Sequence, residues 1–153
     1  RNALKEVRDM ATQMRGTRLE DEMFRIKQIL KAAEIEFVMA GDPILSNTSL
    51  LVENVLSMCL KEAVTNVVKH SGATVCSIVI ESSATELTMK IIDNGVGIQT
   101  DSALVRGSGL RGMKERLEFV NGSMEIAAGI DSGTKVVIKV PNAVKHPDKE
   151  VII

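Results

Sequence analysis

The chain of 153 residues carries 19 basic and 20 acidic side chains, a formal net charge of −1, and 44% of its residues are hydrophobic. This length and apolar content predict one well-packed domain with short appendages, not two domains. The balanced charge and the 2% aromatic content argue against nucleic-acid binding, and no apolar run reaches the ~18 residues that span a bilayer, so we expect no direct contact with nucleic acid or membrane.

The chain opens with a short apolar seam. Its members follow 3-4-3 spacing and are Leu4, Val7, Ala11 and Met14. The seam ends at Gly16, a typical C-terminal residue of a helix. We therefore expect residues 1–15 to be the end of a helical hairpin and residues 16–18 to be a linker.

A second helix and a short strand are predicted next. Thr17 and Glu20 fit a capping box at the start of this helix. Its apolar face comprises Leu19, Met23, Ile26, Leu30 and Ala33. Residues 35–39 form a strand candidate, which the turn sequence AGDP ends.

A long helix from about Thr48 to His70 is predicted to end at Gly72. Two strands with alternating apolar residues follow, and their short polar connection predicts an antiparallel pair. The alternating residues are Cys76, Ile78 and Ile80, then Leu87, Met89 and Ile91. Cys59 and Cys76 lack the CxxC spacing of a metal site, so both are predicted to be small core residues in a reducing, cytoplasmic compartment.

The rest of the chain is predicted to contain a loop, a helix, a hairpin and a tail. The loop covers residues 94–108, and the helix carries Leu110, Met113, Leu117 and Val120 on one side. Strand alternation around the turn GIDSG predicts the hairpin, and residues 141–153 are expected to be a loosely held tail. Helices on one face of a mixed, mostly antiparallel sheet make an α+β, two-layer sandwich over residues 19–140.

Three patterns in this framework suggest chemistry, and the first lies on the long helix. Glu62, Asn66 and Lys69 or His70 share one stripe, because residues three and four apart are neighbours on a helix surface. An asparagine oxygen together with phosphate oxygens suits Mg²⁺, which takes hard oxygen ligands. A solvated helix face explains the same pattern.

The second pattern is IIDNGVGI, residues 91–98. Asp93 lies on the same face as the apolar residues of its strand, so its carboxylate needs a hydrogen-bond donor. The amino group of adenine supplies such a donor, whereas guanine presents an acceptor there. Gly95 and Gly97 would let the backbone approach a flat ring. An Asn-Gly turn after a strand is the alternative interpretation.

The third pattern is GSGLRGMKER, residues 107–116. Gly107 and Gly109 precede a helix whose first amide groups suit phosphates, and Arg106, Arg111 and Lys114 add positive charge. Taken alone, a flexible loop with a glycine N-cap explains this sequence. All three patterns in this order are not expected to coincide by chance.

Together the patterns resemble the N, G1 and G2 boxes of the GHKL superfamily of ATP-binding domains, over about residues 19–140. EAVTNVVKHS is similar to the histidine-kinase version of the first box. GLRGMKERLEFVNGS resembles the short-lid sensor kinases that signal to response regulators with LuxR-type DNA-binding outputs. The resemblance implies a Bergerat-type fold and a protein histidine kinase domain that binds ATP and Mg²⁺.

The resemblance also implies roles on the phosphate side of the nucleotide. Asn66 would ligate Mg²⁺, Glu62 would help to arrange the water shell of the metal, and Lys69 and His70 would contact the phosphates. The backbone amides of a short lid would also contact the phosphate chain, and they belong to Gly107, Ser108, Gly109 and Leu110.

On the adenine side, the resemblance implies that Asp93 binds the amino group of the base. Thr134, after Gly133, would support Asp93, and Gly95 and Gly97 would admit the base. The phenylalanine-rich lid motif of longer-lid kinases is not evident between Gly97 and Gly107.

Sensor kinases of this kind place the acceptor histidine, followed by an acidic residue, on a dimeric helical hairpin, and this chain has no such pair. We therefore expect it to phosphorylate a separate hairpin domain for relay to a response regulator. The full-length protein is expected to be a homodimeric bacterial membrane sensor, and the chain itself a cytoplasmic monomer. A GHKL serine kinase of the anti-sigma type and a non-catalytic ATP-binding regulatory module are the alternatives.

Overall fold

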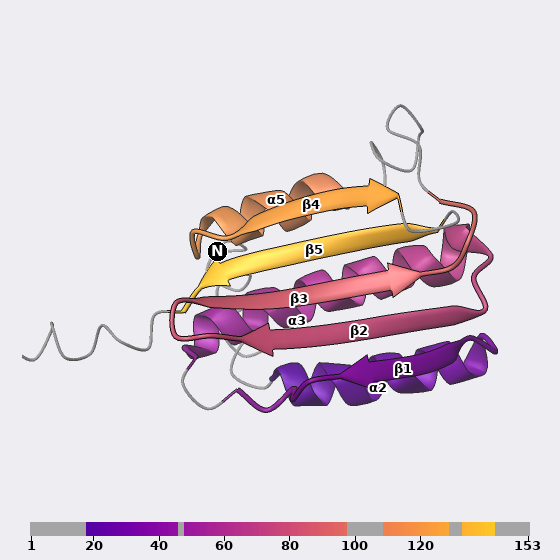
Figure 1. Ribbon diagram of the computed structural model, residues 1–153, viewed down its shortest axis with the longest axis horizontal. Helices are drawn as coiled ribbons and strands as arrows, with labels where there is room; N and C mark the ends of the chain where they lie inside the picture. Colours follow the sequence, from indigo (N-terminus) through magenta and orange to yellow (C-terminus); the bar gives the residue numbers. More distant parts are fainter. Residues whose placement is uncertain (1–17, 46–47, 98–108, 129–132, 143–153) are drawn as a thin grey trace, which may run out of the picture.

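The computed structural model describes residues 18–45, 48–97, 109–128 and 133–142, which form helices packed on one sheet (Figure 1). The sheet has five strands in the order β1-β2-β3-β5-β4. They are β1 (Glu36–Ala40), β2 (Val75–Ser82), β3 (Glu86–Asp93), β4 (Ser123–Ala128) and β5 (Thr134–Pro141). β1 is parallel to β2 and the other neighbours are antiparallel, so the two predicted antiparallel pairs are present as β2–β3 and β4–β5.

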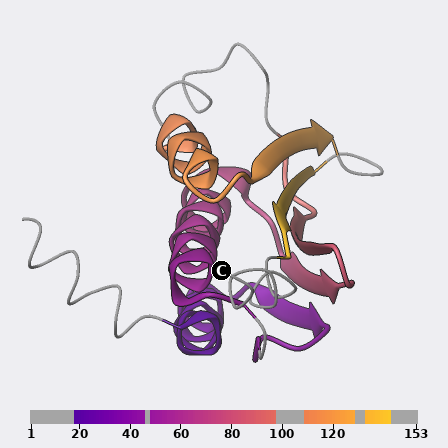
Figure 2. The same cartoon turned by 90° about the vertical axis from the view of Figure 1, so that its left-hand side faces the viewer.

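The helices of the described residues all lie on one face of this sheet (Figure 2). The α-helices are α2 (Leu19–Ala32), α3 (Leu50–Asn66) and α5 (Leu110–Glu118). α3 packs between α2 and α5 and contacts both. The arrangement confirms the predicted two-layer sandwich with a mixed, mostly antiparallel sheet.

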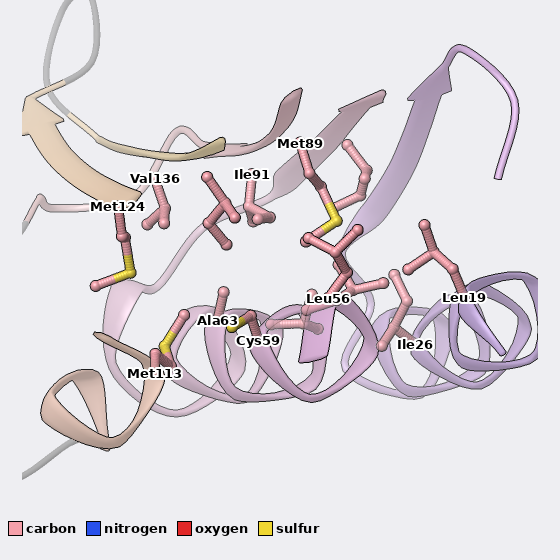
Figure 3. Close-up of a cluster of buried hydrophobic side chains, with 14 of the residues drawn as sticks. Leu19, Ile26, Leu56, Cys59, Ala63, Met89, Ile91, Met113, Met124 and Val136 are labelled. Carbon is pink, nitrogen blue, oxygen red and sulfur yellow. The ribbon is translucent and has the colours of Figure 1, made fainter. Parts of the chain in front are cut away.

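The core fills the space between the two layers (Figure 3). Every alternating residue predicted for β2 and β3 is buried, as are the predicted core residues of α2 except Ala33, which is exposed and caps that helix. Burial of each large aliphatic side chain contributes about 1.5–3 kcal/mol. Alternation on the strands and the helical repeat on α2 therefore predicted which residues stabilise the fold.

Both cysteines belong to this core. Cys59 of α3 and Cys76 of β2 are free and buried. Burial raises the pKa of each thiol to about 12, so both stay protonated at neutral pH. They are core residues, as the sequence predicted.

The start of α2 differs from the predicted capping box. The N-cap is Arg18, whose side chain makes no capping bond. Instead the buried carboxylate of Glu53 accepts a hydrogen bond from the Leu19 amide at 3.3 Å and one from the Arg18 guanidinium at 3.2 Å. A tertiary contact from α3 thus replaces the local cap predicted for Thr17 and Glu20.

The predicted long helix also changes character near its end. α3 stops at Asn66, and Val67–Ser71 continue as a π-helix, η1, before Gly72 turns the chain with a φ of 67°. Single π-helical turns are frequent at functional sites. η1, and not the 3.6-residue repeat of α3, therefore sets the positions of Lys69 and His70.

Several predictions concern other parts of the chain. The apolar seam, the first two residues of the predicted linker, and Gly107 and Ser108 of the lid lie outside the described residues, and so do residues 143–153 of the predicted tail. The other predicted linker residue, Arg18, is the N-cap of α2. The expectation of a loosely held tail from residue 141 is wrong for its first two residues, because Pro141 pairs with Glu86 in the sheet and the Asn142 amide donates to the carbonyl of Thr85 at 2.9 Å. Within the described ranges, no helix combines the length and the apolar character needed to cross a membrane.

Candidate nucleotide-binding site

A cavity opens between the end of α3, η1, the start of α5 and the facing ends of β3 and β5. It is lined by Ala63, Asn66, Val67, His70, Ser71, Ile91, Asp93, Gly97, Leu110, Ile126, Thr134 and Val136. Asn66, His70, Asp93, Gly97, Leu110 and Thr134 were predicted from the sequence as site residues. The fold thus brings residues from all three sequence patterns to one cavity.

Asp93 lies at the end of β3, with only 6% of its surface exposed. Its Oδ1 accepts a hydrogen bond from the Gly95 amide at 2.7 Å, and the Thr134 backbone also donates to the carboxyl group. Burial raises the pKa of Asp93, while these two backbone hydrogen bonds lower it. A carboxylate has about four acceptor positions, so Asp93 keeps acceptor capacity for a ligand in the cavity.

The backbone after Asp93 approaches its surroundings closely. A Cβ on Gly95 would overlap the backbone carbonyl of Ser71. Gly97, which lines the cavity, has a φ of +90°, a conformation that side chains other than glycine rarely adopt. Both glycines of the predicted pair are therefore required by the backbone itself.

Asn66 is the last residue of α3 and is partly buried at the cavity wall. Within the described part of the chain, its side-chain amide has no hydrogen-bond partner. His70 of η1 also lines the cavity and is exposed, whereas Lys69 is exposed but does not line it. The phosphate side of the predicted site therefore has a free amide oxygen and a nearby imidazole.

Glu62 lies outside the cavity lining, one helical turn before Asn66, and is partly buried. Its carboxylate lies against Gly109, where an added Cβ would be 2.5 Å from Oε2 of Glu62. Gly109 has a φ of +85° and is the N-cap of α5. The contact joins the start of α5 to the side of α3 that carries Asn66.

The cavity has an apolar wall that the sequence patterns did not identify as a site. Ile91 of β3 pairs with Val136 of β5, which pairs with Ile126 of β4. These side chains form one row across three strands and line the cavity beside Asp93. Their alternation predicted a buried sheet face, but only the register of the strands places them beside the cavity. A flat aromatic ring suits such a wall.

The donor set of the cavity fits Mg²⁺ held together with a nucleotide. Within the described residues, no group of three His, Cys, Asp or Glu side chains could hold a metal. The Asn66 amide, which has no hydrogen-bond partner among the described residues, would supply one hard oxygen, and phosphate oxygens and water would supply the others.

The sequence matches a family described as histidine kinase-, DNA gyrase B-, and HSP90-like ATPases over residues 52–144. This range is more than half of the chain and contains every residue of the cavity. The chain belongs to this family. As a member of these ATPases, the chain is an ATP-binding domain. The cavity that is lined by residues of the three sequence patterns therefore lies in an ATP-binding fold.

Two curated relatives from Bacillus subtilis (strain 168) are similar along most of the chain. Sensor histidine kinase DesK is 47% identical over 142 residues, which cover 93% of this chain and 38% of DesK. Sensor histidine kinase YvfT is 38% identical over 141 residues, which cover 92% and 37%. The chain thus spans less than half the length of these relatives, and the predicted resemblance to sensor histidine kinases is confirmed.

Solved structures show the same fold in more distant proteins. The ATP-binding domain of PrrB from Mycobacterium tuberculosis has a TM-score of 0.65 at 20% identity and covers 82% of this chain and 95% of that domain. The blue-light activated histidine kinase of Erythrobacter litoralis EL346 has a TM-score of 0.69 at 18% identity, covering 85% and 43%. These likenesses confirm the Bergerat-type fold.

Proposed function

We propose that the chain is the catalytic domain of a two-component sensor histidine kinase. It binds Mg·ATP and transfers the γ-phosphate to a histidine on a separate helical hairpin domain, from which a response regulator receives it. The observation that carries this proposal is the cavity, which is lined by the buried carboxylate of Asp93, by His70, and by Asn66, whose side-chain amide has no hydrogen-bond partner among the described residues.

The adenine end selects the base. Asp93 accepts a hydrogen bond from the amino group of adenine, while its bonds to Gly95 and Thr134 hold the carboxylate in place. Guanine presents an oxygen at that position, which would face a carboxylate with no proton between them. The base lies on the apolar row of Ile91, Val136 and Ile126.

The phosphate end holds the metal and the transferred group. The amide oxygen of Asn66 would ligate Mg²⁺, which would neutralise phosphate charge. His70 and Lys69 would contact the phosphates, Glu62 would arrange water around the metal, and lid amides from Gly107 to Leu110 would bind the phosphate chain. An imidazole nitrogen of the hairpin domain attacks the γ-phosphorus in line, the bond to the bridging oxygen breaks, and ADP leaves.

The partners follow from what the transfer needs. The acceptor histidine comes from the dimerisation hairpin of the parent protein, so the full-length kinase is a homodimer and the isolated chain a monomer. We place the domain on the cytoplasmic side of a bacterial membrane sensor. Its receiver partner is a response regulator with a LuxR-type output.

Phosphotransfer in trans tests this proposal. The chain is incubated with γ-labelled ATP, Mg²⁺ and the hairpin domain of DesK, and an Asn66→Ala variant serves as the inactive control. We expect acid-labile, alkali-stable label on the hairpin and none on the chain alone. Acid-stable label on a partner would favour a serine kinase, and nucleotide binding with no label would favour a non-catalytic module.

A further inference from the structure

Ser71 is a cavity residue to which none of the sequence patterns assigns a role. It is the last residue of η1 and 8% exposed. Its hydroxyl donates to the carbonyl of Val67 at 2.7 Å and accepts from the amide of Ala73 at 3.0 Å. One side chain thus closes the π-helical turn and begins the link to β2.

The backbone of Ser71 makes a second connection. Its carbonyl accepts a hydrogen bond from the amide of Val96 at 2.8 Å, in the loop after Asp93. The same carbonyl occupies the space that a side chain on Gly95 would need. The end of η1 therefore packs directly on the loop that leaves the adenine end of the cavity.

A neighbouring side chain reinforces this junction. Oδ1 of Asn94 accepts hydrogen bonds from the amides of Thr74 at 2.9 Å and Val75 at 3.0 Å, and its Nδ2 donates to Oγ1 of Thr74 at 2.9 Å. Residues 71–75 and residues 94–96 are thereby held together, and we call them the Ser71 junction. The junction connects the segment that carries His70 to the segment that begins at Asp93.

We propose that Ser71 is a positioning residue, which sets the distance between the phosphate end and the adenine end of the nucleotide cavity. The one proton of its hydroxyl is donated to Val67, and the Ala73 amide donates to its oxygen, so it acts through the shape of η1 and not by contact with the reacting atoms. The affinity of a ligand that fills only the adenine end does not depend on this distance. The affinity of a ligand that reaches both ends does depend on it.

Two ligands of different length test the proposal, which rests on the proposed function only in assuming that the cavity binds ATP. The 153-residue chain is titrated calorimetrically with adenosine and with a non-hydrolysable ATP analogue plus Mg²⁺. For Ser71→Ala we expect the ATP analogue to bind at least about fivefold more weakly. Misplacement of one end of the cavity weakens only a ligand that contacts both ends. Adenosine affinity should change by less than about twofold.

Ser57→Ala is a matched control. Ser57 of α3 is also buried, its hydroxyl donates to the carbonyl of Glu53 four residues earlier at 2.9 Å, and it does not line the cavity. Ser57→Ala loses one such bond, whereas Ser71→Ala also loses the bond from the Ala73 amide, so Ser71→Ala should lose more thermal stability. Only Ser71→Ala should change the ratio of the two affinities.

Asn94→Ala provides a second variant of the same junction, and it should shift the ratio in the same direction. Equal weakening of both ligands by Ser71→Ala, an unchanged ratio, or the same shift in Ser57→Ala would overturn the role of Ser71. Failure of the wild-type chain to bind either ligand would overturn both proposals. Normal binding without phosphotransfer to the hairpin would remove the kinase function and leave the role of Ser71 standing.

Discussion

Two glutamates of α3 have opposite surroundings. Glu53, near the start of the helix, is 1% exposed and accepts hydrogen bonds from the Arg18 guanidinium and the Leu19 amide. Glu62, toward the end of the helix, is partly buried and lies against Gly109, and no described residue donates a hydrogen bond to it. A buried carboxylate with partners within the protein is already satisfied, whereas one without them is free to act on a ligand.

Asp93 lies between these two extremes. It is buried like Glu53 and has two backbone donors, yet it faces a cavity and retains acceptor capacity. Burial alone therefore does not separate structural from functional carboxylates. The useful criterion is whether donors from the protein use up the acceptor positions.

The largest effect is expected for Asp93→Asn. The amide still accepts from Gly95 and Thr134 but presents donors toward adenine, so the affinity for the ATP analogue should fall about 10²-fold, as for loss of a charged hydrogen bond. Calorimetry measures the loss. Asp42→Asn is the control, because Asp42 accepts the amide of Ile44 at 2.9 Å on the exposed surface.

Asp93→Asn should also change how the stability of the ligand-free protein depends on pH. Because the folded pKa of Asp93 is raised, the folded state holds the proton more tightly than the unfolded state, and the carboxyl lowers stability as pH rises through its titration. Asp93→Asn should therefore gain stability relative to wild type as pH rises from about 4 to 7. A loss of relative stability over that range would mean that the ionised carboxylate stabilises the fold.

Glu53→Ala should differ from Asp93→Asn, because it should lower the stability of the fold and not the affinity for the nucleotide. Removal of the carboxylate leaves the Leu19 amide without its cap, and the free energy of unfolding should fall by about 2 kcal/mol. The affinity for the ATP analogue should stay within about twofold of wild type. Urea unfolding and calorimetry measure the two quantities.

Glu22→Ala is the matched control for Glu53. Glu22 is 5% exposed and pairs with Arg25 within α2 at 3.0 Å, but among the described residues no backbone amide donates to its carboxylate. Its loss should cost less stability than the loss of Glu53. A weakened nucleotide affinity in Glu53→Ala with unchanged stability would contradict the division between the two ends of α3.

Glu62→Gln should lower phosphotransfer to the hairpin about tenfold, since a carboxylate that orders water or a proton contributes at least that much. Stability should stay within about 0.5 kcal/mol, because no described donor depends on Glu62. Rates of hairpin labelling and urea unfolding measure the effects. Glu115→Gln, on the exposed surface of α5, should leave both unchanged, and a stability loss in Glu62→Gln would assign that residue a structural role.

Local patterns predicted the sheet and one end of the site. Alternation placed Cys76, Ile78 and Ile80 on the core face, and it turned Asp93 inward at the end of β3. Both results depend only on the two-residue repeat of a strand. The glycine after Asn94 was likewise recognisable, although the carbonyl that requires it belongs to a distant residue.

Features that depend on tertiary contacts were not predictable from local patterns. The cap of α2 comes from Glu53, far along the chain, so the nearby Thr17 and Glu20 were the only local candidates. The π-helical turn of η1 uses residues that would also continue an α-helix. The role of Ser71 depends on Val96, which lies beyond two strands. Local repeats do not encode these long-range hydrogen bonds.

The smallest effect is expected for Asn54→Leu, and it tests the comparison most directly. Asn54 of α3 is 2% exposed, and within the described residues neither polar atom of its side chain has a hydrogen-bond partner. It does not line the cavity, so a missing partner here carries a cost without a ligand to offset it. An apolar side chain of similar size should raise the free energy of unfolding by up to about 1 kcal/mol and leave nucleotide affinity unchanged. A loss of stability by urea unfolding would mean that the amide has a partner in solution. A gain of stability would mean that the Asn54 amide has no partner. A polar side chain of α3 without a partner among the described residues then indicates a ligand site only where it also lines the cavity, as Asn66 does.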